Sequence, residues 1–117
     1  MSTVPRLAVS YQFSRTCPSH EEGLALLHAA AARAGLGVDV TEVEVLDDAQ
    51  AERLAFAGSP TYLAEEGDLL PDAGPAHAFQ HDICRLYHRA GGRVGPLPDL
   101  DDLAGALRAA LTAKAGP

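Results

Sequence analysis

Positive charge is scarce in this sequence. Lys114 is its one lysine, and nine basic residues stand against sixteen acidic ones, which leaves a net charge of -7. Nucleic acids and anionic membrane surfaces are bound mainly by clustered cations. We therefore expect partners that are neither nucleic acid nor membrane.

Long apolar runs and cysteines are scarce as well. No stretch approaches the ~20 apolar residues of a membrane-spanning helix. The start, "MSTVPRLAVSYQF", has too short an apolar run for a secretory signal, so we expect a cytoplasmic protein. Cys17 and Cys84 are too few for a disulfide scaffold. In a reducing cytosol, such cysteines are more often reactive, metal-binding or buried than structural.

The sequence does contain the material for one packed domain, because 47% of its 117 residues are hydrophobic. Residues 6–13 are predicted to form a buried strand. Apolar residues then recur at helical spacing after Pro18, which suits the first position of a helix, and Gly35 or Gly37 is expected to end that helix.

The middle of the chain predicts a second strand, 38–45, and a short helix. The alternation of valines in this strand slips between Val40 and Val43, which indicates a bulge or a strand buried on both faces. Asp47 or Asp48 is expected to cap the short helix, and Gly58 to end it.

Residues 61–64 and 68–70 are predicted to form a β-hairpin, and Asp99 to cap a C-terminal helix. Residues 71–98 form an extra segment between them. The resulting order, β-α-β-α-β-β and then α, predicts an α/β domain with a mixed sheet and helices on its faces.

The stretch "TCPSH" places Cys17 where the first strand gives way to the first helix. A cysteine that caps a helix faces unpaired backbone N–H groups and the positive end of the helix dipole, and both favour the thiolate. The thiolate is the nucleophile and the metal ligand. We therefore predict that Cys17 is the more reactive cysteine, provided that it is not buried. His20, one turn along, is predicted to reach the sulfur and to tune or assist it.

This order, with "CPSH" opening the first helix and "SPT" opening the third strand, resembles the thioredoxin-like superfamily over residues 6–70 and 99–113. The resemblance implies a three-layer sandwich with a mixed central sheet, and an insertion at about 71–98. It also implies that Cys17 is the attacking cysteine, and that Pro60 is a cis proline facing it in a substrate-binding segment with Ser59 and Thr61. His20 stands where the family's resolving cysteine would be, so the usual dithiol motif is absent.

Cys84 lies in the extra segment and has three alternative interpretations. If the segment folds across the start of the first helix, Cys84 could form a disulfide with Cys17 as a displaced resolving thiol. It could also be a packed residue with no chemistry, or it could bind a metal.

The metal interpretation has two observations behind it: the spacing of His81 and Cys84 mirrors that of Cys17 and His20, and the residues around Cys84 recur at helical spacing. If this stretch were a helix, its spacing of four, three and four residues would place four possible ligands on one face: His77, His81, Cys84 and His88. A soft site for Zn, Cu or Hg would use Cys17, His20, His81 and Cys84. In the opposing interpretation, "CRLYH" is a short strand, the histidines are solvated, and Ile83, Leu86 and Tyr87 pack on the core. A basic strip of Arg85, Arg89 and Arg93 is expected to be solvated.

The leading hypothesis is therefore a thioredoxin-like thiol protein that acts through Cys17 on a protein or small-molecule thiol or disulfide, or on a thiophilic substrate. The sequence identifies no certain cofactor, and zinc or another thiophilic metal is the candidate. The alternatives are a protein that binds zinc or another thiophilic metal, and a non-catalytic interaction module that associates as a homodimer.

Overall fold

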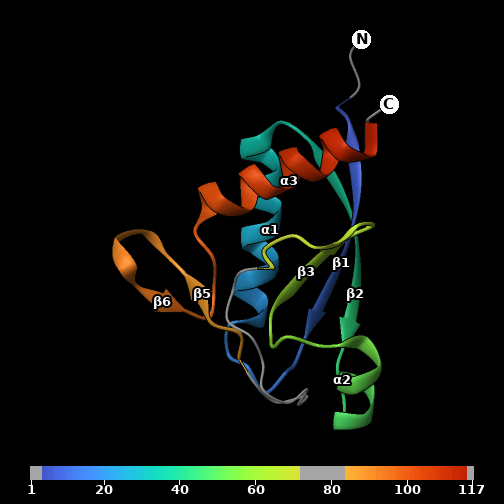
Figure 1. Cartoon of the computed structure of the whole chain (residues 1–117), viewed down its shortest axis with the longest axis vertical. Coiled ribbons are helices and arrows are strands. Elements are labelled where there is room, and N and C mark those ends of the chain that lie inside the picture. Colours follow the sequence, from blue (N-terminus) through green and yellow to red (C-terminus); the bar gives the residue numbers. More distant parts are fainter. Residues whose placement is uncertain (1–3, 72–83, 116–117) are drawn as a thin grey trace.

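The computed structural model describes residues 4–71 and 84–115. Its sheet has four strands in the order β2-β1-β3-β4, and β5 and β6 form a separate two-stranded ladder (Figure 1). The elements, in chain order, are β1 (Arg6–Phe13), α1 (His20–Ala34), β2 (Gly37–Glu44), α2 (Asp48–Leu54), β3 (Thr61–Ala64), β4 (Gly67–Asp68), β5 (Tyr87–His88), the 3₁₀ turn η1 (Ala90–Gly92), β6 (Val94–Gly95) and α3 (Leu100–Ala115).

The sheet is mixed, as predicted. β1 and β2 run parallel, with Arg6 opposite Gly37 and Phe13 opposite Glu44. β3 is antiparallel to β1, and β4 is antiparallel to β3. A parallel pair needs a crossover, which α1 supplies, whereas the tight turn after β3 leads directly into β4. The β5–β6 ladder lies between β4 and α3 in the chain, inside the predicted extra segment.

The main core lies between one face of the sheet and the helices α1 and α3, which pack against each other (Figure 1). Alternate residues of β1, beginning at Leu7, are buried against these helices. Leu27 of α1 and Leu103 and Leu107 of α3 have no exposed surface. No helix in the described ranges combines the length and apolar character that crossing a membrane requires.

Within the described residues, the opposite face of the sheet is covered only near its α2 end. Ala8 on that face is exposed and Ser10 is half-buried. Farther along, Val45 packs with Ala51 and Phe56 in a second cluster around α2. Among the described residues, the third layer expected from the resemblance is therefore a single short helix at one end of the sheet.

This uneven cover explains the slipped valine pattern of β2. The register between β1 and β2 is continuous, so the predicted bulge is wrong. Val38 and Val40 belong to the α1–α3 side. By strand alternation, Val43 and Val45 lie on the other face, where α2 covers the sheet. The slip thus marks the point where the covering helix changes.

Most predicted ends of helices agree with the structure. α1 ends before Gly35, whose φ is 77°, and Asp47 caps α2 by accepting a hydrogen bond from the backbone N–H of Gln50 at 2.8 Å. The prediction that Gly58 ends α2 is wrong. The helix ends at Ala55, which itself adopts a left-handed conformation with φ 51°.

Candidate functional site

The chain makes a separate turn between β1 and α1, and Cys17 lies in that turn. Its N–H donates to Ser14 O at 3.1 Å, and its carbonyl accepts from the N–H of His20 at 3.3 Å. Ser19 is the N-cap of α1. The prediction that Cys17 caps the helix is therefore wrong, because a closed turn delays the start of the helix to His20. The Cys17 side chain is also buried, with 1% of its surface exposed.

The sulfur of Cys84 lies directly against that of Cys17. Cys84 Sγ donates to Cys17 Sγ at 3.0 Å, and both residues are free cysteines. A disulfide bond is 2.03–2.05 Å long, so the two sulfurs are about 1 Å from bonding distance. The structure thus brings together the two cysteines whose proximity was left open by the sequence.

Ser59 contacts both the Cys17 side chain and the Cys84 segment. Cys84 forms an isolated parallel bridge with Ser59, and the N–H of Arg85 donates to Ser59 O at 3.0 Å. The same carbonyl lies 3.6 Å from Cys17 Sγ. The Ser59–Pro60 peptide bond is cis, as the resemblance implied. One buried residue before β3 therefore positions both cysteines.

Arg85 anchors the Cys84 segment by its side chain. Its Nη2 lies 2.8 Å from an Asp68 carboxylate oxygen and donates to Leu70 O at 2.6 Å. Its Nη1 donates to Thr61 Oγ1 at 3.4 Å, and its guanidinium lies 4.8 Å from the centroid of the Tyr87 ring. The prediction of a solvated arginine is wrong here, because the Asp68 carboxylate, Leu70 O and the Thr61 hydroxyl replace its water.

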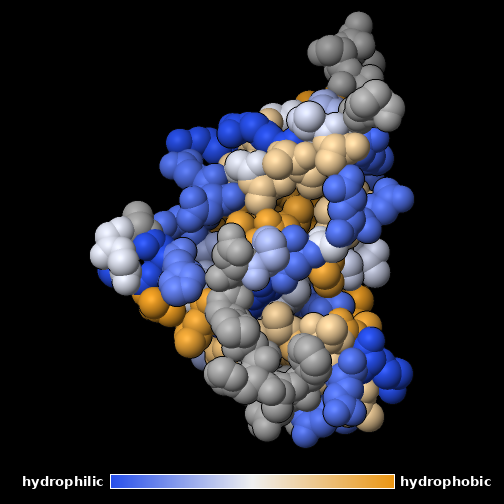
Figure 2. All heavy atoms as spheres, viewed as in Figure 1, coloured by the Kyte–Doolittle hydropathy of each residue, from blue (hydrophilic) through white to orange (hydrophobic). Residues whose placement is uncertain are grey.

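Burial alternates strictly along this segment. Cys84, Leu86 and His88 are exposed, whereas Arg85 and Tyr87 are buried. The expectation that Leu86 packs on the core is therefore wrong, because Leu86 is an exposed large hydrophobic residue, as is Val94 of β6. Figure 2 shows apolar surface beside β5 and β6. The alternation is that of an extended chain lying on the domain, with the Cys84 side chain at its exposed edge.

The close approach of the Cys84 segment explains why residue 58 is a glycine. Gly58 has a φ of 119°, and a Cβ added there would lie 2.8 Å from the backbone N and Cα of Arg85. Any side chain at this position would both strain the backbone and push the Cys84 segment away. Gly58 is therefore part of the site, a role that the sequence interpretation missed.

The residues expected to bind substrate are covered by the chain itself. Ser59, Pro60 and Thr61 are all buried. Ser59 Oγ accepts from the N–H of Ser14 at 2.9 Å, Pro60 O accepts from the Tyr87 hydroxyl, and the Thr61 hydroxyl donates to Gly58 O. In this conformation, they hold the Cys84 segment and present no open surface to a substrate chain.

His20 contacts the backbone of Cys17 and not its sulfur. His20 Nδ1 lies 3.1 Å from Cys17 O, and the ring stacks on Phe13 with a centroid separation of 5.4 Å. Because a carbonyl oxygen only accepts, Nδ1 carries the proton. The ring lines a small hollow of about 190 Å³ that includes Glu42. His20 thus stabilises the turn that holds Cys17.

The predicted metal site has no counterpart in the described part of the chain. His77, His81 and Ile83 lie outside the described residues, and within these no group of three or more His, Cys, Asp or Glu could hold a metal ion. The predicted helical face of Cys84 and His88 is wrong for this half of the pattern, because this stretch is extended.

The two sulfurs differ in their surroundings. Cys17 is buried, whereas Cys84 is exposed at the residue level. Partial burial of the Cys84 thiol, then its hydrogen bond to Cys17 and the charge of that residue, raise the pKa of Cys84 to about 11. Cys84 therefore keeps its proton at neutral pH and remains the donor of the sulfur–sulfur contact.

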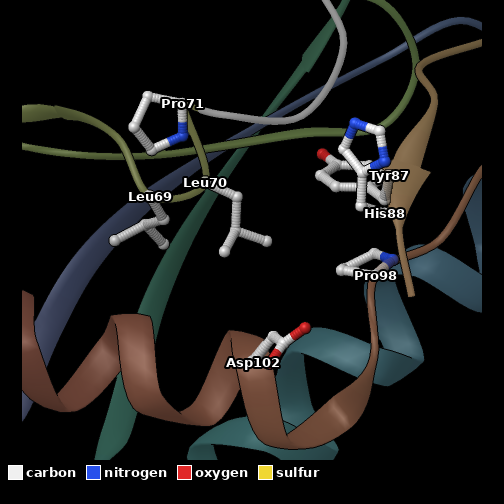
Figure 3. Close-up of a pocket in the computed structure, with 7 residues that line it drawn as sticks. All are labelled: Leu69, Leu70, Pro71, Tyr87, His88, Pro98 and Asp102. Carbon is white, nitrogen blue, oxygen red and sulfur yellow. The ribbon is translucent and has the colours of Figure 1, made fainter. Parts of the chain in front are cut away.

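A second hollow, of about 370 Å³, lies between the end of the hairpin, β5 and the start of α3 (Figure 3). Its lining is mostly apolar, with Asp102 of α3 and Tyr87 and His88 of β5 around it (Figure 3). It contains no cysteine, and the Tyr87 hydroxyl bonds to Pro60 O. This hollow borders Tyr87 and His88 and does not include the sulfur pair.

The chain was compared with protein-family models, curated proteins and solved structures, and no match was found. The function must therefore be argued from the site itself.

Proposed function

We propose that this protein is a thiol–disulfide oxidoreductase in which Cys17 and Cys84 cycle between a dithiol and a disulfide. The observation that carries the proposal is the 3.0 Å separation of the two sulfurs. Two thiols that touch in a folded protein are held at a high effective concentration, so a mixed disulfide on one of them is resolved quickly by the other.

The architecture supports a thioredoxin-like assignment. The order β2-β1-β3-β4, with β1 and β2 parallel and the hairpin antiparallel, follows the expected topology. The cis Ser59–Pro60 peptide bond, directly before β3, lies beside Cys17. The second cysteine comes from the extra segment instead of the first turn of α1, where His20 stands.

The proposed cycle balances with a disulfide substrate as the oxidant. A disulfide R–S–S–R accepts two electrons, and the Cys17 and Cys84 thiols lose two protons and form one S–S bond. Two R–SH molecules leave. The same cycle run backwards oxidises two substrate thiols and regenerates the protein dithiol. The substrate is thus a protein or a small molecule bearing a thiol or a disulfide.

Equilibration in glutathione redox buffers tests this proposal. We expect the full-length protein to lose the mass of two hydrogen atoms and both free thiols in oxidising buffer, and to recover them in reducing buffer. Cys17→Ser and Cys84→Ser are matched controls, which should form only mixed disulfides with glutathione. Two persistent free thiols in excess oxidised glutathione would contradict the proposal. Stoichiometric zinc bound to those thiols would favour the soft-metal alternative instead.

A further inference from the structure

We propose that Cys84, and not Cys17, is the sulfur that exchanges with the substrate, and that Cys17 is the resolving sulfur. This assignment rests on the proposed function, and it reverses the roles expected from the sequence. It is carried by the relative positions of the two sulfurs and by their difference in burial.

Within residues 4–71 and 84–115, Cys17 is enclosed by its neighbours. Its side chain is 1% exposed, its sulfur lies 3.6 Å from Ser59 O, and the sulfur of Cys84 covers it at 3.0 Å. Cys84 is exposed and belongs to an extended segment whose other exposed members, Leu86 and His88, face solvent. A substrate therefore meets Cys84 first.

The geometry of thiol–disulfide exchange makes this difference decisive. The attacking sulfur approaches in line with the bond that breaks. Because Cys17 is buried and Cys84 is exposed, we expect a line from Cys17 through Cys84 in their disulfide to lead outward, toward solvent. The opposite line leads from Cys84 through Cys17 into the domain. Only attack on Cys84, with Cys17 as the leaving group, has an open approach.

The reaction then has two balanced steps. A substrate thiolate attacks Cys84 Sγ, forming R–S–S–Cys84 and releasing the Cys17 thiolate. A second substrate thiolate attacks the R sulfur, forming R–S–S–R and releasing the Cys84 sulfur, and both cysteine sulfurs take up protons from water. Two electrons pass from the substrate thiols to the protein disulfide. In the reverse direction, the Cys17 thiolate attacks the mixed disulfide at Cys84 and expels R–S⁻.

The protonation of Cys84 favours one direction of this cycle. Because its pKa is raised to about 11, only a small fraction of Cys84 in the reduced protein is the nucleophilic thiolate at neutral pH. In the oxidised protein, Cys84 is the attacked sulfur and needs no ionisation of its own. The exchange therefore begins more readily from the disulfide form, with a thiol as the substrate.

Mapping of the first adduct tests the assignment. Oxidised full-length protein is pulsed with glutathione, quenched with acid, alkylated after denaturation and analysed by peptide mass spectrometry. Glutathione on Cys84 and alkylation on Cys17 are expected. Glutathione on Cys17, or equally on both, would overturn the assignment while leaving the proposed function intact. Failure of the wild type to form any intramolecular disulfide would reject both.

The single-cysteine variants decide the case if resolution is too fast for the adduct to be seen. Cys17→Ser keeps the exposed sulfur, and Cys84→Ser keeps the buried one. With 5,5′-dithiobis(2-nitrobenzoate) at pH 8, we expect Cys17→Ser to react at least about 10-fold faster than Cys84→Ser. Equal rates, or the opposite order, would overturn the assignment, and circular dichroism of both variants checks that each is folded.

Discussion

Removal of the Arg85 guanidinium should both destabilise the fold and loosen the sulfur pair. The Arg85 side chain is 1% exposed and its partner Asp68 is 23% exposed. Arg85→Met keeps an apolar stem against Tyr87 but leaves the Asp68 carboxylate without its cation and Leu70 O without a donor. Breaking a buried ion pair by removing one partner costs about 3–5 kcal/mol. Because Asp68 keeps some contact with water, we expect about 2–4 kcal/mol here.

The effect on the cysteines follows from their position in the chain. Arg85 directly follows Cys84, and its backbone N–H holds Ser59 O. When its side-chain anchors are lost, the Cys84 segment should spend less time against Cys17. We expect the equilibrium constant for disulfide formation in glutathione buffers to fall by about 10-fold, which corresponds to about 1.4 kcal/mol.

Two assays separate these effects. Urea unfolding of the reduced protein reports the loss of stability, and the glutathione equilibrium of the folded protein reports the loss of proximity. Arg53→Met, at an exposed position of α2, is the matched control and should stay within about 0.5 kcal/mol of the wild type. Arg85→Lys serves if the methionine variant does not fold. An Arg85→Met protein with unchanged stability and an unchanged equilibrium would refute this account of the anchor.

Other consequences of the packing can be measured with the same preparations. Gly23→Ala should lower the free energy of unfolding by about 1–3 kcal/mol, because a Cβ there would overlap a tyrosine hydroxyl and lie 2.8 Å from Pro60 Cγ. Gly105→Ala, with open space around it, should raise that free energy by about 0.5–1 kcal/mol, and a gain at Gly23 would contradict the packing. Burial raises the pKa of all three tyrosines, so the folded state holds their protons and should lose stability as the pH rises above about 10, with tyrosinate absorbance appearing only on unfolding. Cys17→Ser removes two causes of the raised pKa of Cys84, so the midpoint of Cys84 alkylation by iodoacetamide should move below about 11, and an unchanged midpoint would argue against the sulfur contact.

The parts of the fold that obey local rules could be predicted from the sequence. β1 spans the predicted residues, because its apolar pattern and flanking turn residues are local signals. Asp47 caps α2 and Gly35 ends α1 for equally local reasons. The slipped valines of β2 could be explained only from the tertiary structure. In the sequence, a strand that is covered by different helices at its two ends shows the same shift in valine pattern as a strand with a bulge.

The site was predicted less well, because its geometry depends on distant contacts. The dipeptide Cys17-Pro18 is typical of a helix start, but the Cys17 carbonyl closes a turn and α1 begins later. Nothing local fixed where Cys84 would lie, and an arginine is usually solvated, so Arg85 was placed on the surface. The alternating burial from Cys84 to His88 could not be predicted from hydropathy, because the exposed face includes the apolar Leu86 and the buried face includes the charged Arg85.

Ser59 is the point at which three distant parts of the chain meet. Its hydroxyl accepts from the N–H of Ser14 in the turn before α1, and its carbonyl accepts from the N–H of Arg85. Cys17 is fixed by backbone hydrogen bonds on both sides, whereas the Cys84 segment is laid onto this frame from outside. We therefore expect Cys84 to make most of the approach of about 1 Å that the disulfide requires. The two free cysteines are not equivalent: Cys17 is buried and held in a closed turn, whereas Cys84 is exposed on an extended segment, where we propose that a substrate meets it.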